Sequence, residues 1–194
     1  MNAERRQVTV LFTDMVGFTT FSERAGEEAA FTLMRSLAKL MDDAVREQGG
    51  VTHAFTGDGI MAVFGAPVAF EDAPLRACRA ALAIVQRLET NGNDLKSRHG
   101  LRPQLRIGLN AGTAIVGVVQ GGVDAAVTVL GDTVNVASRL QASRARFGVD
   151  DRGDAPIGAG NGGSEFRRAA RDQGQIRTAK GLSARLCSPW RNTI

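Results

Sequence analysis

Two aspartates in similar surroundings are the residues of this 194-residue sequence whose type and spacing best suit chemistry. Asp14 ends an apolar run that should form a strand, and Asp58 lies at the tip of a Gly-Asp-Gly turn between two further apolar segments. If those strands are neighbours, the two carboxylates can bridge two Mg²⁺ or Mn²⁺ ions, which take oxygen ligands and leave positions for phosphate. The plainer alternative is that Asp14 caps the next helix and Asp58 only satisfies its turn.

The loop after Asp14 has a composition that suits phosphate binding. Residues 15–19 read Met-Val-Gly-Phe-Thr, and Gly17 removes a side chain that would block close approach to the backbone N–H groups. The N-terminus of the following helix adds a partial positive charge. A tight connection that needs glycine for its own geometry is the alternative interpretation.

A further polar pair lies in a short helix that we predict over Asp132–Leu140. Asn135 and Arg139 are four residues apart, so their side chains project from the same face of that helix. Residues of these types on an exposed helix are usually ordinary surface groups, and the spacing alone only permits a joint role.

The elements that must position these residues are predicted from apolar periodicity and from turn residues. A helix with its apolar face over residues 31–45 stops at Gly49-Gly50, and a second opens at Asp72 and Pro74 and runs to Asn93 or a little beyond. Hairpins between strands favour an α+β sandwich, with helices on one face of a mainly antiparallel sheet. The predicted strands are Gln7–Thr13, Val51–Phe55, Ile60–Phe64, Leu105–Asn110, Thr113–Val119 and Ala125–Leu130. A turn at residues 111–112 is predicted between the fourth and the fifth of these strands.

Three segments taken together resemble the catalytic domain of the class III nucleotidyl cyclases, the enzymes that close ATP or GTP into a 3′,5′-cyclic nucleotide. They are Val10–Thr19, Phe55–Gly65 and Gly131–Leu140, and the resemblance covers about residues 7–143. It implies a ferredoxin-like βαββαβ core and two Mg²⁺ or Mn²⁺ ions per site. It also implies a head-to-tail homodimer, in which opposite subunits supply the aspartate pair and the Asn/Arg pair.

The resemblance implies a role for each motif residue. Asn135 would position the ribose, and Arg139 would stabilise charge on the α-phosphate. Arg106 resembles a phosphate-contacting arginine of the family, with a plain surface arginine as the alternative. The metal ligands would be Asp14, Asp58 and the carbonyl of Met15, and the triphosphate loop would be Gly17, Phe18 and Thr19.

The base-reading positions depart from the better-known adenylate cyclases, which have a lysine and an aspartate where this sequence has Ala54 and Thr128. Threonine at the second position occurs in an adenylate cyclase subclass and can hydrogen-bond the adenine amino group. The Glu and Cys of guanylate cyclases are absent, so we expect ATP rather than GTP, with guanylate cyclase as an alternative. His53 could replace the missing lysine, although a lone histidine beside a strand is more often structural.

The last quarter of the chain does not match the family. Residues 1–143 carry 14 Lys and Arg against 15 Asp and Glu, whereas residues 144–194 carry 10 against 5, so the excess basic charge lies in the tail. The tail is rich in Gly and Arg, and we expect a poorly ordered basic arm or an altered reading frame. The family's phosphate-binding lysine segment has only Lys180 as a distant counterpart. We therefore predict a cyclase domain over residues 1–143, incomplete at its C-terminal end, and a separate tail.

Composition limits the remaining possibilities. The N-terminus is polar and no apolar run approaches the roughly 18 residues of a membrane span, so we expect a cytoplasmic protein without membrane contact. Two unclustered cysteines favour neither a disulfide framework nor a metal site. Adenylate cyclase is the leading hypothesis, and a catalytically degenerate, nucleotide-binding relative is the second. A nucleic-acid binder is the weakest, because the basic tail has few aromatic residues.

Overall fold

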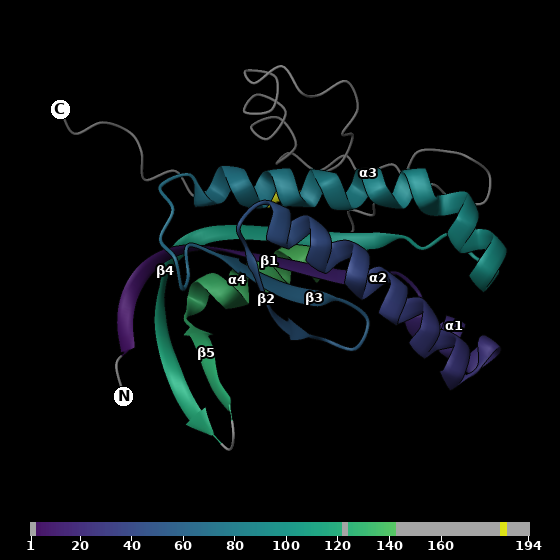
Figure 1. Cartoon of the computed structure of the whole chain (residues 1–194), viewed down its shortest axis with the longest axis horizontal. Coiled ribbons are helices and arrows are strands. Elements are labelled where there is room, and N and C mark those ends of the chain that lie inside the picture. The colour runs from purple at the N-terminus through teal and green to yellow at the C-terminus, as the bar shows by residue number, and fades with distance from the viewer. Residues whose placement is uncertain (1–2, 122–123, 143–182, 186–194) are drawn as a thin grey trace.

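The computed structural model describes residues 3–121, 124–142 and 183–185. Strands and helices are interspersed along the chain (Figure 1). The strands are β1 (Ala3–Met15), β2 (Val51–Phe55), β3 (Ile60–Phe64), β4 (Leu105–Gly121), β5 (Asp124–Leu130) and β6 (Ser183–Arg185). The helices are α1 (Phe18–Ala25), α2 (Glu27–Glu47), α3 (Ala73–His99) and α4 (Asp132–Ala142).

The sheet has the strand order β2-β3-β1-β4-β5, and every pairing along this path is antiparallel. β6 lies off this path and pairs with β4 in parallel over Gly108–Asn110. The order β2-β3-β1-β4 is that of the predicted ferredoxin-like core, with β5 added at its edge. The predicted α+β class and mainly antiparallel sheet are therefore confirmed.

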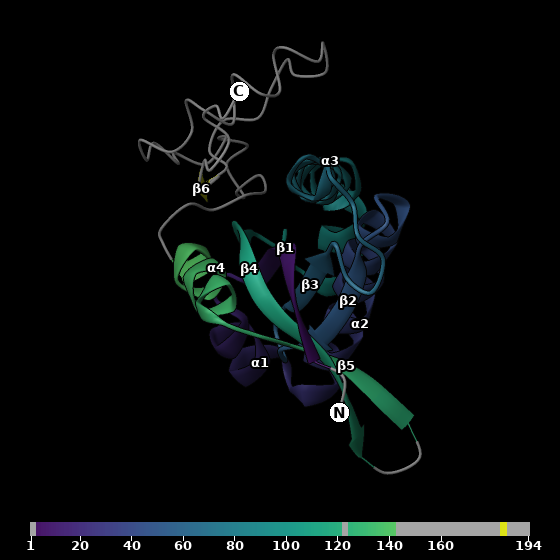
Figure 2. The same ribbon diagram turned by 90° about the vertical axis from the view of Figure 1, so that its left-hand side faces the viewer.

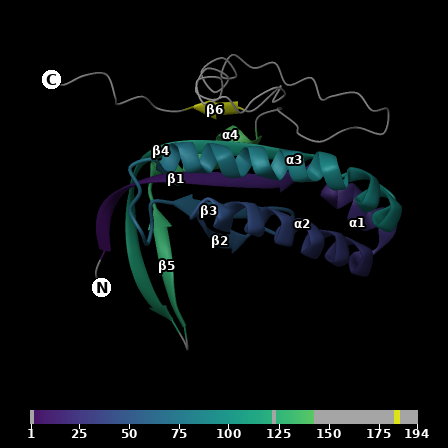
Figure 3. The same ribbon diagram turned by 45° about the horizontal axis from the view of Figure 1, so that its top comes forward.

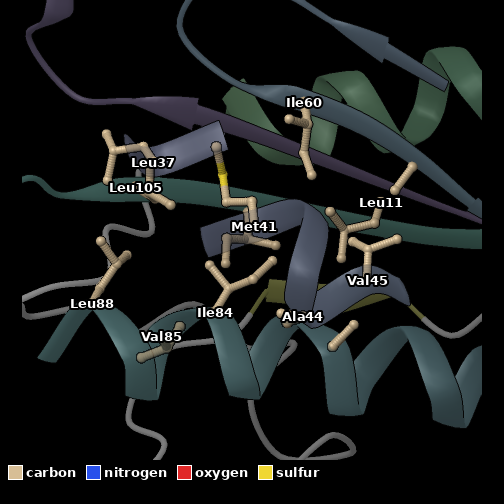
Figure 4. Close-up of a cluster of buried hydrophobic side chains, with 14 of the residues drawn as sticks. Leu11, Leu37, Met41, Ala44, Val45, Ile60, Ile84, Val85, Leu88 and Leu105 are labelled. Atoms are coloured by element: carbon tan, nitrogen blue, oxygen red, sulfur yellow. The ribbon is translucent and has the colours of Figure 1, made fainter. Parts of the chain in front are cut away.

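The two long helices cover one face of the sheet, and the main hydrophobic core lies between them and the strands (Figure 4). Met41 of α2 and Ile84 of α3 are fully buried there against strand residues such as Leu11 and Leu105. The alternation of buried and exposed residues in α2 follows helical periodicity, so burial of this apolar face stabilises the helix more than its intrinsic propensity does.

α4 packs against the opposite face of the sheet from α2 and α3 (Figure 2). A second, smaller core forms there from Ala137 of α4 and the outward-facing valines of β1, β3 and β4. Gly108 of β4 allows the close approach, because a Cβ at this position would lie 2.3 Å from the Gln141 nitrogen and 2.4 Å from the Ala137 carbonyl oxygen. The sheet is thus covered on both faces along the first part of β4.

Three predicted elements differ from the structure. The turn predicted at residues 111–112 is wrong, because β4 is one continuous strand paired with β1 from Leu105 to Gly117. Phe18–Ala25 forms a helix of its own that ends at Gly26, where φ is 87°. α3 continues past Gly92 to His99, because Leu95 extends the buried face and the left-handed Gly100 then ends the helix.

The distal parts of β4 and β5 extend away from the helices as a two-stranded arm (Figure 3). At the base of the arm, Ile115 and Leu130 are paired across the two strands and are 43% and 61% exposed. In the part of the chain that the structure describes, no helix is both long enough and apolar enough to cross a membrane. The predicted tail, residues 144–194, lies outside the described residues except for β6.

Candidate active site

The two aspartates come together because β1 and β3 are neighbours in the sheet. The antiparallel register runs from Thr9 opposite Phe64 to Phe12 opposite Met61, and the chain then continues past Asp14 on one side and back to Asp58 on the other. The Met15 N–H donates to the Asp58 carbonyl over 2.8 Å, so the two backbones stay joined beyond the regular ladder. A hydrogen bond between the two carboxyl groups is among the causes that raise the pKa of Asp14. The predicted convergence of Asp14 and Asp58 is therefore present.

The turn that carries Asp58 needs its two glycines for different reasons. Gly57 has a φ of 92°, in the left-handed region, and the Thr56 N–H donates to the Gly59 carbonyl over 3.0 Å. Gly59 is required by packing, because a Cβ there would lie 1.9 Å from the carbonyl oxygen of Thr13. Gly59 does not have a positive φ, and its lack of a side chain instead allows β3 to approach β1 closely.

Arg106 lies directly opposite Asp14 in the β1–β4 register. Its Nη1 donates to Asp14 Oδ2 over 3.0 Å, and both side chains are partly buried. Gln141, near the end of α4, also hydrogen-bonds the Asp14 carboxyl group. The Asp14 side chain therefore has three neighbours in its own chain: Asp58 from the turn before β3, Arg106 from β4 and Gln141 from α4.

The pKa of Asp14 is raised to about 6, first by burial and then by its hydrogen bond with Asp58 and the charge of that residue. Arg106 and Gln141 lower the pKa but do not offset the rise. Two carboxyl groups held this close favour a shared proton or a bound cation over two free negative charges.

This donor set fits cations that prefer oxygen ligands, such as Mg²⁺ and Mn²⁺. Within the described residues no group of three or more His, Cys, Asp or Glu side chains could hold a metal ion. A pair of carboxylates that leaves positions for water and phosphate is the usual way in which proteins bind Mg²⁺. Asp14 and Asp58 would hold the ions, with the remaining ligands coming from backbone and substrate oxygens.

The loop after Asp14 uses part of its backbone internally. The Met15 N–H bonds Asp58, and the Val16 N–H donates to the Gln104 carbonyl over 2.8 Å, so the first two of the five predicted N–H groups are already engaged. Gly17 is the N-cap of α1 with a φ of 72°, and a Cβ there would meet nothing within 4 Å. Glycine is needed for this backbone conformation rather than for space. Because the first N–H groups of a helix lack intrahelical partners, Phe18 and Thr19 remain suited to an anion.

Asn135 and Arg139 lie on the exposed side of α4. Arg139 makes an ion pair of 3.4 Å with Asp132 of its own helix. The residue of α4 that hydrogen-bonds Asp14 is Gln141, which no pattern in the sequence singles out. The side chains of Asn135 and Arg139 therefore face solvent in the single chain.

The positions expected to read the base lie on the two edge strands β2 and β5. Ala54 is exposed on β2, and Thr128 is half-buried on β5 opposite Gly117. His53 lies where the β2–β3 register shifts, and burial lowers its pKa. A neutral, half-buried imidazole in an irregular strand fits the structural interpretation of His53 better than the replacement of a lysine.

Thr13 is a site residue that the sequence analysis missed. It lies in β1 beside Asp14, is 2% exposed, and its hydroxyl accepts a hydrogen bond from the Ile60 N–H over 2.9 Å. A threonine between Leu11 and Met15 on the inward face of an apolar strand was the only signal of a buried polar contact.

The family model for the adenylate and guanylate cyclase catalytic domain matches residues 1–149 of the 194. The chain belongs to the class III nucleotidyl cyclases. A curated relative is adenylate cyclase 1 of Rhizobium meliloti, 38% identical to this cyclase domain over 148 residues. The alignment covers 76% of this chain and 22% of the relative, so the chain spans about a fifth of that protein's length.

Solved structures with the same fold include enzymes of both base specificities. The guanylyl cyclase Cya2 superposes on this cyclase domain with a TM-score of 0.69 and 29% identity, covering 73% of this chain and 72% of Cya2. The catalytic core of a rhodopsin-guanylyl cyclase with converted specificity, in complex with ATPαS, has a TM-score of 0.66 and 31% identity, covering 74% and 76%. The likeness therefore extends to a protein named as an adenylate cyclase and to guanylyl cyclases, one of them with converted specificity.

Proposed function

We propose that this cyclase domain converts ATP to 3′,5′-cyclic AMP and pyrophosphate at a site shared between two copies of the chain. The observation that carries the proposal is the contact between Asp14 and Asp58, with Arg106 bound to Asp14 from the neighbouring strand. Few structural roles require two carboxyl groups in a partly buried contact, whereas the binding of divalent ions beside phosphate does.

Each site residue has a defined task in this reaction. When bound, the paired ions would polarise the ribose 3′-oxygen and neutralise charge on the triphosphate. Asp14 and Asp58 hold the ions, and the N–H groups at the start of α1 bind phosphate oxygens. Arg106 is placed to exchange its contact with the Asp14 carboxylate for one with a phosphate oxygen, because a guanidinium forms equivalent hydrogen bonds with either anion.

The shared site follows from the placement of α4. Asn135 and Arg139 are exposed, while the residue of α4 that hydrogen-bonds Asp14 is Gln141, which supports a site completed by a second copy. A second copy would supply the amide for the ribose and the guanidinium for the α-phosphate. The exposed Ile115 and Leu130 at the base of the arm, and Phe55 on β2, offer apolar surface for such a contact.

ATP is the proposed substrate because Thr128 can accept a hydrogen bond from the adenine amino group, and because neither base-reading position carries an acid that could bind guanine. The curated relative described above is an adenylate cyclase. A hydroxyl alone discriminates weakly, so a measurable but slower reaction with GTP is expected.

A catalytically degenerate, nucleotide-binding domain is the second candidate. The exposed methyl group of Ala54 favours it, because nothing at that position can hydrogen-bond the purine. Such a domain would bind Mn²⁺ and ATP with no turnover.

The deciding experiment incubates the purified full chain with Mn²⁺ and either ATP or GTP, and separates the products by chromatography. Cyclic AMP as the main product supports the proposal, cyclic GMP as the main product replaces ATP by GTP, and binding without product selects the degenerate domain. Asp58→Ala should abolish product, and Asp94→Ala is the matched control, because among the described residues Asp94 makes an exposed ion pair with Arg98. Equal rates for the two variants would contradict the metal assignment.

A further inference from the structure

We propose that the buried hydroxyl of Thr13 is the positioning group that holds Asp58 against Asp14, and that it thereby sets the affinity of the pair for divalent ions. This inference rests on the proposed function and goes beyond it, because it assigns metal affinity to a side chain that touches neither metal nor substrate.

The Thr13 hydroxyl uses both of its hydrogen-bonding capacities inside the core. It accepts from the Ile60 N–H over 2.9 Å and donates to the Met41 Sδ over 3.1 Å. Thr13 is 2% exposed and Met41 is fully buried, so water does not compete for either bond. The hydroxyl therefore ties β1 to the first residue of β3 and to the middle of α2.

The position of this bond explains its importance for Asp58. The antiparallel register of β1 and β3 ends at Phe12 opposite Met61, one residue before Ile60 is reached. Beyond that point the side chain of Thr13 takes the Ile60 N–H, while Gly59 packs against the Thr13 carbonyl too closely for any Cβ. Further on, the Met15 N–H binds the Asp58 carbonyl. The segment Asp58–Ile60 is thus held to β1 by a hydrogen bond at each end, and the one at Ile60 depends on the Thr13 side chain.

Removal of the hydroxyl should act on the metal site through the backbone. Thr13→Val keeps the shape of the side chain but leaves the Ile60 N–H buried without its acceptor, which is unfavourable enough to shift the start of β3. A shift there moves Asp58 relative to Asp14. Residues that orient metal ligands typically contribute about 10–100-fold to metal affinity, and we expect an effect of this size.

Thr9 provides a matched control on the same strand. It lies four residues before Thr13, on the same face of β1, and is 1% exposed. Within the described part of the chain its hydroxyl has no hydrogen-bond partner. Thr9→Val therefore makes the same chemical change at an equally buried site without removing a bond.

The experiment measures Mn²⁺ binding to the full chain by electron paramagnetic resonance of the free ion, and independently the Mn²⁺ concentration that gives half-maximal cyclase activity. Thr13→Val should weaken both by about 10–100-fold. It should approach the wild-type rate at high Mn²⁺, because only positioning is impaired. Thr9→Val should bind Mn²⁺ as the wild type does. Equal Mn²⁺ affinities for Thr13→Val and Thr9→Val would overturn the inference.

Thr13→Ser keeps the test decisive if Thr13→Val does not fold, because serine retains the hydroxyl and lacks only the methyl group. Mn²⁺ affinity close to that of the wild type supports the inference, and a tenfold loss or more in Thr13→Ser overturns it. A wild-type chain that binds no Mn²⁺ would instead contradict the proposed function, which separates the two failures.

Discussion

Arg106 donates a 3.0 Å hydrogen bond to Asp14 from the position directly opposite it in the β1–β4 ladder. The pair joins a proposed metal ligand to a proposed phosphate ligand before any substrate is present. Substitution of Arg106 should therefore affect the affinity for metal ions and the affinity for nucleotide differently.

Arg106→Gln should raise KM for ATP and lower kcat/KM by about 10²–10³-fold, because a guanidinium aimed at charge that develops on phosphate is lost. The affinity for free Mn²⁺ should not fall, because the substitution removes a positive charge beside Asp14. Steady-state kinetics and Mn²⁺ titration measure the two quantities. Arg98→Gln, which breaks only an exposed ion pair with Asp94, is the control. Weaker Mn²⁺ binding with an unchanged KM would assign Arg106 to metal-site structure instead.

Without metal ions, the stability of the domain should fall as pH rises from about 4 through about 6, because the folded-state pKa of Asp14 is raised from 3.8 to about 6. A carboxyl group with a raised pKa favours the folded state while it is protonated and loses this contribution as it ionises. The side chain is partly exposed, so solvent screening reduces the effect to about 1 kcal/mol.

Thermal unfolding followed by circular dichroism across this pH range measures the effect. Asp14→Asn should flatten that part of the profile and raise Tm at neutral pH, whereas Mn²⁺ should raise Tm at neutral pH only in the wild type. A wild-type Tm that rises between pH 4 and 6 in the absence of metal would contradict the assigned pKa.

Gly108→Ala should impair catalysis through α4. The new Cβ would lie 2.3–2.4 Å from the backbone of this helix, which must move outward and carry Asn135 and Arg139 with it. We expect a loss of about 1–3 kcal/mol in the free energy of unfolding and a lower kcat. Urea denaturation and initial rates measure both.

Gly92→Ala is the matched control for this substitution. Gly92 lies inside α3, and its nearest neighbour would be the Arg102 side chain at 4.0 Å, so alanine should stabilise the domain by up to about 1 kcal/mol. Similar destabilisation by both substitutions would mean that helix α4 does not require Gly108.

The shared site predicts complementation between two inactive variants. Asp58→Ala and Asn135→Ala should each abolish activity, but a mixture that is unfolded and refolded together should recover about a quarter of the wild-type rate, because random pairing leaves one intact site in each mixed dimer. Product formation by the mixture measures the recovery. A mixture that stays inactive, from variants that each dimerise and bind Mn²⁺, would place all catalytic groups within one chain.

Strand periodicity and glycine-flanked turns predicted where Asp14 and Asp58 leave their strands, but their convergence depended on the condition that these strands are neighbours, which the sheet order provides. The sequence also predicted the α+β class and the two long helices. It could not predict that β4 continues through Ala111-Gly112, because a small-residue pair permits a turn without requiring one, and pairing with β1 decides the outcome.

The missed contacts of the site depend on tertiary packing. Gly59 resembles a turn residue in the sequence, yet its role is to avoid the Thr13 carbonyl, and nothing local indicates this. Gln141 reaches Asp14 only because Gly108 lets α4 lie close to the sheet. Such contacts join segments that are far apart in the chain, so periodicity and motif spacing carry no signal for them.

The unbroken course of β4 has a mechanical consequence. One end of this strand carries Arg106 beside Asp14, and the other end forms half of the exposed arm with β5. In the proposed dimer, a neighbouring copy that contacts the arm therefore contacts the same continuous strand that carries Arg106. A change in how the two copies pack would then shift Arg106. A shift of Arg106 would likewise alter the packing of the two copies.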